Sequence, residues 1–297
     1  MSSDSPRSVA VLGYGVLGKP VTHALVKEGA KVVVLSRSAS KLALPSGVSG
    51  VTVSYADEAG VTKALKEHSV DIVFSTLNEL EDAQVSVARA AKAAGTVKLY
   101  VPSEFGAPTN GNKIHPWVAK DAIAETISKE IGIPTVRIFT GLFIEFIPWL
   151  VESDAHPGKI AITGKGQTKF STTSFFDIAA FSAHIIATLP YEQLENIIVR
   201  LEGQSVSIQD IARITGKEIV VVKASELGAA ARANSGLVTT ESSAALQVAI
   251  EAGGLSTGFD PTEPNASAEV VAQRAGSGNA LWKDFVFKKV PAGLFDV

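Results

Sequence analysis

A short glycine pattern near the start of the chain is the strongest constraint on its fold. The apolar run Val9–Leu12 leads directly into Gly13-Tyr14-Gly15-Val16-Leu17-Gly18, and a stretch with helical spacing follows. In such a strand–turn–helix, the first glycine permits a tight turn, the second lets the backbone approach a pyrophosphate, and the third allows close helix–strand packing. The helix N-terminus then offers free N–H groups to an anion. The pattern predicts a dinucleotide site; the alternative is a turn whose glycines are purely structural.

The first 140 residues alternate between short apolar runs and longer stretches with helical spacing. The runs are continuously apolar, which is typical of strands buried on both faces of a parallel sheet. The alternation predicts a doubly wound, Rossmann-type α/β sheet with right-handed crossovers. We expect strands at Val9–Leu12, Lys31–Leu35, Val51–Ser54, Asp71–Ser75, Val97–Val101 and Thr135–Phe139, and helices at Leu17–Glu28, Glu58–His68, Glu81–Ala94 and Pro116–Ile131.

The pattern changes after about Pro148, which indicates a smaller, mixed lobe. We expect a Rossmann domain over residues 1–157, completed by elements within 173–203, and a smaller lobe over 158–297. Gly158–Gly166 is turn-rich, and Gly253–Asn265 forms a loop that is either a cover over the site or an inert excursion. In between we expect helices at Phe175–Leu189, near Ser207, at Ala224–Arg232 and at Glu241–Gly253, and strands at Asn196–Leu201 and Glu218–Val222.

The residues after the second strand indicate which dinucleotide binds. An NAD site usually has Asp or Glu about 20 residues beyond the glycines, to bond the ribose 2′-hydroxyl. Here the tip reads Leu35-Ser36-Arg37-Ser38, with Lys41 one turn later and no carboxylate. A guanidinium fork suits a 2′-phosphate. We therefore predict NADPH, held near Arg37 and Lys41; the alternative is a solvated surface arginine.

Composition excludes several other classes of protein. The chain contains no cysteine, which excludes disulfide scaffolds, thiolate metal sites and a cysteine nucleophile. Its 27 basic and 30 acidic residues give a net charge of −3, so nothing points to nucleic acid. No apolar run reaches the length of about 20 residues that a spanning helix needs. The segment Met1–Ser8 is polar and lacks a signal-peptide core. We expect a soluble cytoplasmic protein.

A search for a proton donor leaves one strong candidate. None of the four tyrosines is followed by lysine four residues later, and the five histidines lack metal-ligand spacing. Lys120 differs because it lies seven residues before Ile127, on the apolar stripe of Ile123, Ile127 and Ile131, within about 20° of it. A partly desolvated lysine has a lowered pKa and can act as an acid or base. The alternative is a lysine whose stem packs while its ammonium reaches water.

Two further segments follow predicted strands. Ligands of open α/β sheets lie beyond the carboxyl ends of the strands. We expect Thr76 and Leu77 along the adenosine and ribose, and Ser103, Glu104 and Phe105 near the nicotinamide. Together with Gly13–Gly18, Arg37, Lys41 and Lys120, these residues make up the predicted cofactor site.

Together these motifs resemble the isoflavone reductase-like branch of the NmrA-like atypical short-chain dehydrogenases. The resemblance rests on the glycine loop, Arg37, the helix from Gln84 to Gly95, Val101-Pro102-Ser103-Glu104-Phe105-Gly106, and Trp117-x-x-Lys120. It continues through Gly132–Thr135, Gly141–Phe143 and Phe176–Ala179, and covers about the first 190 residues.

The resemblance implies a Rossmann core that binds NADPH and a smaller lobe that closes over an aromatic substrate. It also implies that Lys120 assists hydride transfer as general acid or base. Two departures stand out: the glycine loop is one residue tighter than the family's commoner G-x-x-G-x-x-G, and Asp121–Glu125 replaces basic residues found in plant reductases.

The segment Phe139–Trp149 is dense in aromatic residues, which suits a planar apolar ligand. We predict Phe105, Phe143, Phe146 and Phe175 as pocket walls; for Phe146 and Trp149 a purely structural role between the lobes is equally consistent. The sequence therefore predicts an NADPH-dependent reductase of a small aromatic or conjugated substrate. The rival prediction is a non-catalytic, NADP(H)-sensing regulator of the NmrA type.

Overall fold

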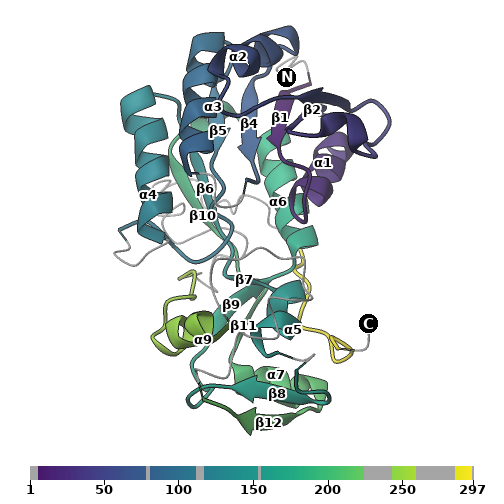
Figure 1. Cartoon of the computed structure of the whole chain (residues 1–297), viewed down its shortest axis with the longest axis vertical. Helices are drawn as coiled ribbons and strands as arrows, with labels where there is room; N and C mark the ends of the chain where they lie inside the picture. Colours follow the sequence, from purple (N-terminus) through teal and green to yellow (C-terminus); the bar gives the residue numbers. More distant parts are fainter. Residues whose placement is uncertain are drawn as a thin grey trace.

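The computed structural model describes residues 6–77, 81–111, 117–152, 155–223, 243–258 and 285–295. Within these residues the chain forms a large α/β part, at the top of Figure 1, and a smaller mixed part below it. The predicted helix at Ala224–Arg232 and the loop beyond residue 258 lie outside the described residues.

The large part is built on a parallel sheet of five strands in the order β3-β2-β1-β4-β5. An isolated parallel bridge between Tyr100 and Thr135 joins β5 to the start of β6, and β6 pairs in parallel with β10. The strands are β1 (Ser8–Leu12), β2 (Lys31–Ser36), β3 (Ser49–Thr52), β4 (Ile72–Ser75), β5 (Leu99–Val101), β6 (Val136–Phe139) and β10 (Ile197–Arg200).

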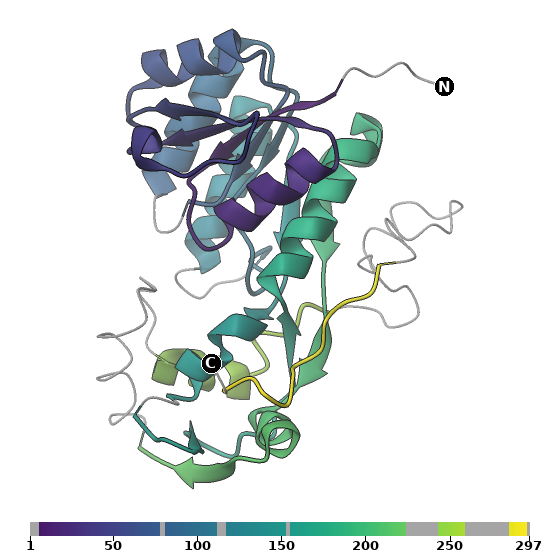
Figure 2. The ribbon, with the colours of Figure 1, turned by 90° about the vertical axis from the view of Figure 1, so that its right-hand side faces the viewer.

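Helices cover both faces of this sheet because the strand residues alternate between two apolar cores. Val9 and Val11 of β1 pack into one core, whereas Ala10 and Leu12 pack into the other. The first core is covered by α1 (Gly18–Lys27) and α6 (Phe175–Thr188), which lie side by side (Figures 1 and 2). The second is covered by α2 (Glu58–Glu67), α3 (Glu81–Ala94) and α4 (Trp117–Glu125). The predicted doubly wound α/β fold is confirmed.

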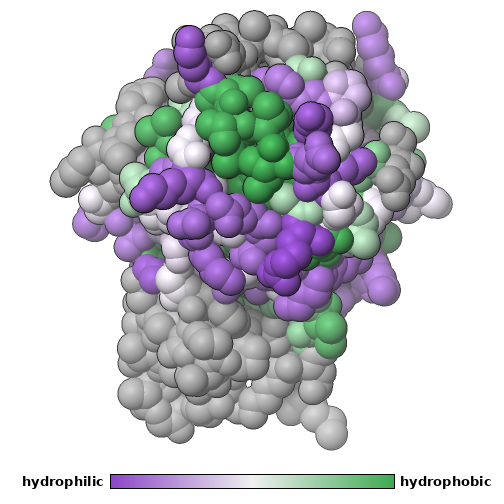
Figure 3. Space-filling view, turned by 90° about the horizontal axis from the view of Figure 1, so that it is seen from below, coloured by the Kyte–Doolittle hydropathy of each residue, from purple (hydrophilic) through white to green (hydrophobic). Residues whose placement is uncertain are grey.

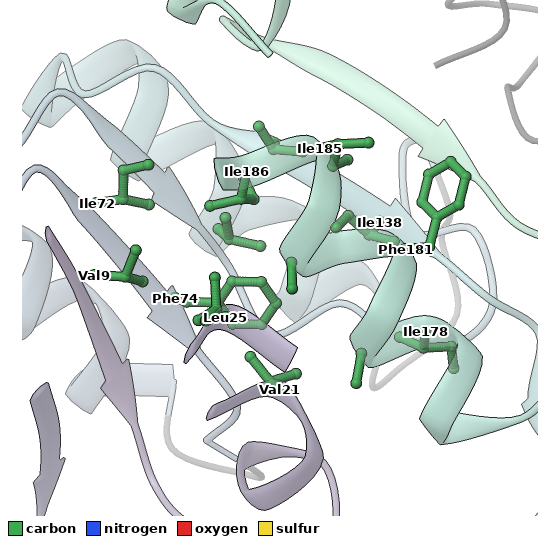
Figure 4. Packing of buried hydrophobic residues seen from close by; sticks show 14 of the residues in the cluster. Val9, Val21, Leu25, Ile72, Phe74, Ile138, Ile178, Phe181, Ile185 and Ile186 are labelled. Carbon is green, nitrogen blue, oxygen red and sulfur yellow. The ribbon is translucent and has the colours of Figure 1, made fainter. Parts of the chain in front are cut away.

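Figure 4 shows how α1 and α6 meet the sheet. The side chains interdigitate between the two helices and three strands, and most are completely buried. The labelled residues are Val9, Val21, Leu25, Ile72, Phe74, Ile138, Ile178, Phe181, Ile185 and Ile186. This packing fixes the start of α1, and with it the glycine loop, against the carboxyl ends of the strands.

The smaller part contains two small sheets. One is mixed, in the order β11-β9-β7, and the other is a parallel pair, β12-β8. The strands are β7 (Leu142–Phe143), β8 (Lys159–Ile162), β9 (Phe170–Thr173), β11 (Gln204–Val206) and β12 (Glu218–Val221); the helices are α5 (Ile147–Leu150), α7 (Ile208–Thr215) and α9 (Ser243–Glu251). Seen from below, the molecule exposes a compact group of apolar residues bordered by polar ones (Figure 3).

Most elements predicted for the first 140 residues are confirmed, with ends that move by one or two residues. The helix predicted over Pro116–Ile131 differs: it is an α-helix from Trp117 to Glu125 and continues as a π-helix over Thr126–Ile131. The turn-rich segment Gly158–Gly166 also contains the strand β8, which was not predicted; it pairs with β12, 59 positions away in the register Lys159–Glu218. Strands β7, β9 and β11 were not predicted. The division at residue 157 stays a prediction. No helix among the described residues has both the length and the apolar character needed to cross a bilayer.

Candidate cofactor and substrate site

The glycine loop leaves β1 and turns sharply into α1. Gly13 has a φ of +83°, a conformation that side chains rarely adopt, and its N–H donates to the oxygen of Leu35 at 3.0 Å. A Cβ atom at position 18 would lie 2.4 Å from the oxygen of Gly13, so only glycine fits there. A Cβ atom at position 15 would meet nothing within 4 Å. The backbone is therefore tightly packed around Gly18, whereas the space beside Gly15 is empty of protein atoms.

The N-terminus of α1 has features that favour the binding of an anion. Among the described residues no side chain caps this helix, and its first turn contains no acidic residue. The positive dipole end of the helix therefore favours a phosphate. Val16 is exposed at the tip of the loop, while Leu17 is buried beneath it. These features fit the pyrophosphate of a dinucleotide.

The residues after β2 and β4 border this loop. Arg37 and Lys41 are exposed, and neither side chain forms a hydrogen bond or ion pair with the described residues. Tyr14 ties the glycine loop to their segment, because its hydroxyl donates to the oxygen of Ala43 at 3.2 Å. Thr76 donates through its hydroxyl to the oxygen of Leu12 at 2.8 Å, and buried Leu77 faces Gly13.

The segment after β5 is held by polar contacts on both sides. The N–H of Ser103 donates to Oε1 of buried Gln84 at 2.9 Å. Glu104 is 2% exposed, and its carboxylate accepts from Nε of Arg137 at 2.8 Å. Phe105 has a φ of +28° and stacks on Phe74 with 5.6 Å between ring centroids. The carboxylate of Glu104 and the ring of Phe105 thus point into the protein, and the backbone of this segment is left to border the site.

Lys120 contacts this same segment. Its Nζ donates to the backbone oxygen of Glu104 at 2.8 Å, and the residue is half-buried. The side chain of Lys120 therefore points inward from α4, as predicted. Since β1, β2, β4 and β5 are parallel, the glycine loop, Arg37, Thr76 and the Lys120–Glu104 contact all lie at the same edge of the sheet.

Three of the four predicted pocket phenylalanines lie together. The ring centroid of Phe143 is 5.1 Å from that of Phe146 and 6.5 Å from that of Phe175. All three are half-buried, whereas Phe105 packs apart from them on Phe74. Phe175 is the first residue of α6, whose N-cap is Ser174, and its N–H donates to the carboxylate of Glu145 at 3.1 Å. We call Phe143, Phe146 and Phe175 the aromatic cluster.

Arg137 was missed by the sequence analysis. It occupies a strand in which every residue is buried, and is itself 7% exposed. A charge in such a strand needs a partner. The presence of an arginine in an otherwise apolar strand is therefore the sequence signal that could have identified Arg137. Its partners, Glu104, Thr109 and Asp121, come from two other segments of the chain.

The sequence profile of the NmrA-like family matches residues 7–227. Among characterised relatives, eugenol synthase 1 of Petunia hybrida is 30% identical over 199 residues, which are 61% of this chain. That match spans 64% of the petunia protein, somewhat less than two thirds of its length. Isoflavone reductase homolog P3 of Arabidopsis thaliana is 28% identical over 246 residues, 74% of this chain and 76% of the relative.

Solved structures share the fold. A ternary complex of leucoanthocyanidin reductase from Vitis vinifera superposes with a TM-score of 0.73 at 24% identity, covering 97% of this chain and 98% of that one. The binary complex of the same grapevine enzyme with NADPH gives a TM-score of 0.72 at 22% identity, with the same coverage.

Proposed function

The chain belongs to the NmrA-like family, and from this premise we propose that it is an NADPH-dependent reductase of a small aromatic or conjugated organic substrate. The main support for this proposal is the position of two features. A glycine loop shaped for a pyrophosphate and a lysine hydrogen-bonded to the opposite loop lie at the same edge of one parallel sheet. The petunia and grapevine relatives, a eugenol synthase and a reductase solved with NADPH, support it.

The residues of the chain fit the parts of NADPH. Gly13–Gly18 and the start of α1 would hold the pyrophosphate, since Gly15 leaves room and Gly18 seats the helix. Arg37, with Lys41 beside it, would hold the 2′-phosphate, because both cations are exposed and β2 ends without a carboxylate. Thr76 and Leu77 would border the ribose, and the backbone of Ser103–Phe105 the nicotinamide ring.

The mechanism needs one hydride and one proton. When bound, NADPH would supply the hydride for reduction of an electrophilic carbon of the substrate. Lys120 supplies the proton from Nζ to the substrate atom that gains electron density, directly or through a water. The oxygen of Glu104 accepts one of the three N–H groups of Lys120 and so orients the ammonium. The aromatic cluster would stack on the substrate and exclude water.

We also propose that cofactor and substrate are bound by different parts of the chain. Residues 1–157, together with elements returned from 173–203, would bind NADPH, and residues 158–297 would form the smaller substrate-binding lobe. The placement of α6 beside α1 and of β10 beside β6 supports this division.

Two measurements test the proposal. NADPH binding is titrated by fluorescence, and NADPH oxidation is then followed against a panel of enones, quinones and phenolic ethers. Lys120→Ala should lower turnover by about 100-fold or more, which is typical for loss of a general acid. The control is Lys129→Ala, which removes a surface ion pair with Glu125. Retained turnover in Lys120→Ala would refute the role of the lysine, and tight NADPH binding without turnover of any compound would favour the regulator.

A further inference from the structure

A buried charge cluster lies directly behind Lys120. Arg137 uses all three nitrogens of its guanidinium. Nε donates to Oε1 of Glu104 at 2.8 Å, Nη1 pairs with Oδ1 of Asp121 at 2.9 Å, and Nη2 donates to the hydroxyl of Thr109 at 2.5 Å. Thr109 in turn donates to the other carboxylate oxygen of Glu104 at 2.9 Å. We call Glu104, Thr109, Asp121 and Arg137 the arginine cluster.

The arginine cluster ties together the elements that present Lys120. Arg137 lies in β6, Glu104 in the loop after β5, and Asp121 in α4. Lys120 is the residue before Asp121, and it donates to the backbone oxygen of Glu104. Both ends of the Lys120–Glu104 contact therefore belong to segments that Arg137 grips. Asp121 is further fixed by the N–H of Gly111 at 3.0 Å.

The backbone beside this contact is strained. Phe105 follows Glu104 and has a φ of +28°, which is rare for a residue other than glycine. Such a conformation costs about 1–3 kcal/mol and persists only where the surroundings enforce it. Its N–H is held by the oxygen of Ile138 at 3.0 Å, one residue beyond Arg137. The arginine cluster and this bond together fix where the oxygen of Glu104 points.

A buried ion pair adds little net stability, because desolvation of both charges offsets their attraction. What the arginine cluster provides is a fixed geometry. The two carboxylates balance the charges of Arg137 and Lys120, so the lysine sits in an electrically neutral group. The hydrogen bond of Lys120 to this cluster uses the backbone oxygen of Glu104, whose carboxylate accepts from Arg137 and Thr109.

We propose that Arg137 is a positioning residue for Lys120: by gripping Glu104 and Asp121 it sets the place of the lysine Nζ relative to the substrate. The proposal rests on the proposed function for its effect on reduction, but the position of Lys120 can be tested independently.

The test follows Lys120 by NMR of protein labelled with ¹³C at the lysine ε-carbons, with the signal assigned by its loss in Lys120→Arg. Two variants perturb the arginine cluster. Arg137→Gln removes all three contacts. Asp121→Asn removes the ion pair at α4 and leaves one oxygen in place of the two that Arg137 and the N–H of Gly111 contact, while the buried Glu104–Arg137 pair remains. The matched control is Arg213→Gln, which breaks an exposed pair with Asp210 on α7. Circular dichroism checks that each variant is folded.

We expect the Lys120 signal to move toward the exposed lysines in both cluster variants and to stay in place in Arg213→Gln. The affinity for NADPH should change by less than about threefold, because the substituted residues, Arg137 and Asp121, lie away from the glycine loop and Arg37, which are proposed to hold the phosphates. The single-turnover rate of hydride transfer should fall by about 10- to 100-fold, as expected for a misplaced catalytic group. Arg137→Lys should restore part of the rate.

An unchanged Lys120 signal in the folded variants would overturn the proposal. If Arg137→Gln does not fold, Asp121→Asn decides, since Asp121 is partly exposed. If the wild-type protein binds no NADPH or reduces no compound, the proposed function fails, whereas the NMR result still decides whether Arg137 positions Lys120.

Discussion

Gly18 lies so close to Gly13 that the two residues close the loop between β1 and α1 by backbone contact alone. A Cβ atom at position 18 would lie 2.4 Å from the oxygen of Gly13 and 2.7 Å from Oγ1 of Thr76. The oxygen of Gly13 is backbone and cannot swing away as a flexible side chain could. The backbone of Gly13 and the side chain of Thr76 thus leave no room for a side chain at position 18.

The first prediction compares two glycines of one loop. Gly18→Ala should lower the free energy of unfolding by about 1–3 kcal/mol, the usual cost of forcing atoms into a packed site. Gly15→Ala should leave stability nearly unchanged, since its Cβ meets no atom, yet weaken NADPH because the added methyl occupies the space of the pyrophosphate. Urea unfolding and NADPH titration measure both. Equal loss of stability in the two variants would contradict this account.

The second prediction concerns the choice of cofactor. Arg37→Ala should raise the Kd for NADPH by about 10- to 100-fold, which corresponds to one lost charge-assisted hydrogen bond. The Kd for NADH should stay the same, because NADH has no 2′-phosphate. Isothermal titration with both nucleotides provides the measurement, and Arg89→Ala, which removes an exposed arginine on α3, is the control. An equal loss for both nucleotides would refute the assignment of Arg37.

The third prediction concerns the aromatic cluster. Phe143→Leu removes the ring that contacts both Phe146 and Phe175. KM for an aromatic substrate should rise by about 3- to 10-fold, since one aromatic contact contributes about 0.5–1.5 kcal/mol. The Kd for NADPH should not change. The matched control is Phe287→Leu, whose ring stacks on Phe181 in the core beside α6. The same KM effect in both variants would show that the cluster does not contact substrate.

The fourth prediction is a dependence of stability on pH. Burial raises the pKa of Tyr55 to about 12, and its hydroxyl donates to the oxygen of Leu35 at 2.9 Å. Above pH 10 the unfolded tyrosine loses its proton while the folded one keeps it, so stability falls as pH rises from 10 toward 12. Tyr55→Phe should remove up to about 1.4 kcal/mol per pH unit of this slope. Urea unfolding between pH 9 and 11, with Tyr191→Phe as control, checks the sign.

The main sheet was predictable because its strands carry their signal locally. Apart from Ser8 and Ser75 at their ends, the residues of β1 and β4 are apolar, and all of them are buried. β9 was not predictable in this way: its sequence Phe-Ser-Thr-Thr is largely polar, and its four residues are buried only because β7 and β11 pair on either side. Pairing between distant segments is invisible to a reading of local periodicity.

The residues of the candidate site also differ in whether their signal is local in the sequence. The glycine loop and Lys120 could be proposed as site residues because their signals, a spacing of glycines and a helical stripe, lie within a few turns of chain. The arginine cluster joins Arg137 to Glu104, 33 positions earlier, and no local pattern encodes that contact. Phe105 was predicted as a pocket wall, but its strained backbone directs the ring onto Phe74, away from the aromatic cluster.

The path of the chain has a consequence for its synthesis on the ribosome. β6 runs directly into β7 of the smaller sheet, α6 returns from β9 to the large part, and β10 then leads back into β11. The outer edge of β6 therefore stays without its partner until residues 197–200 have emerged. During translation that edge is open to other chains, and neither part can be completed before the other has been started.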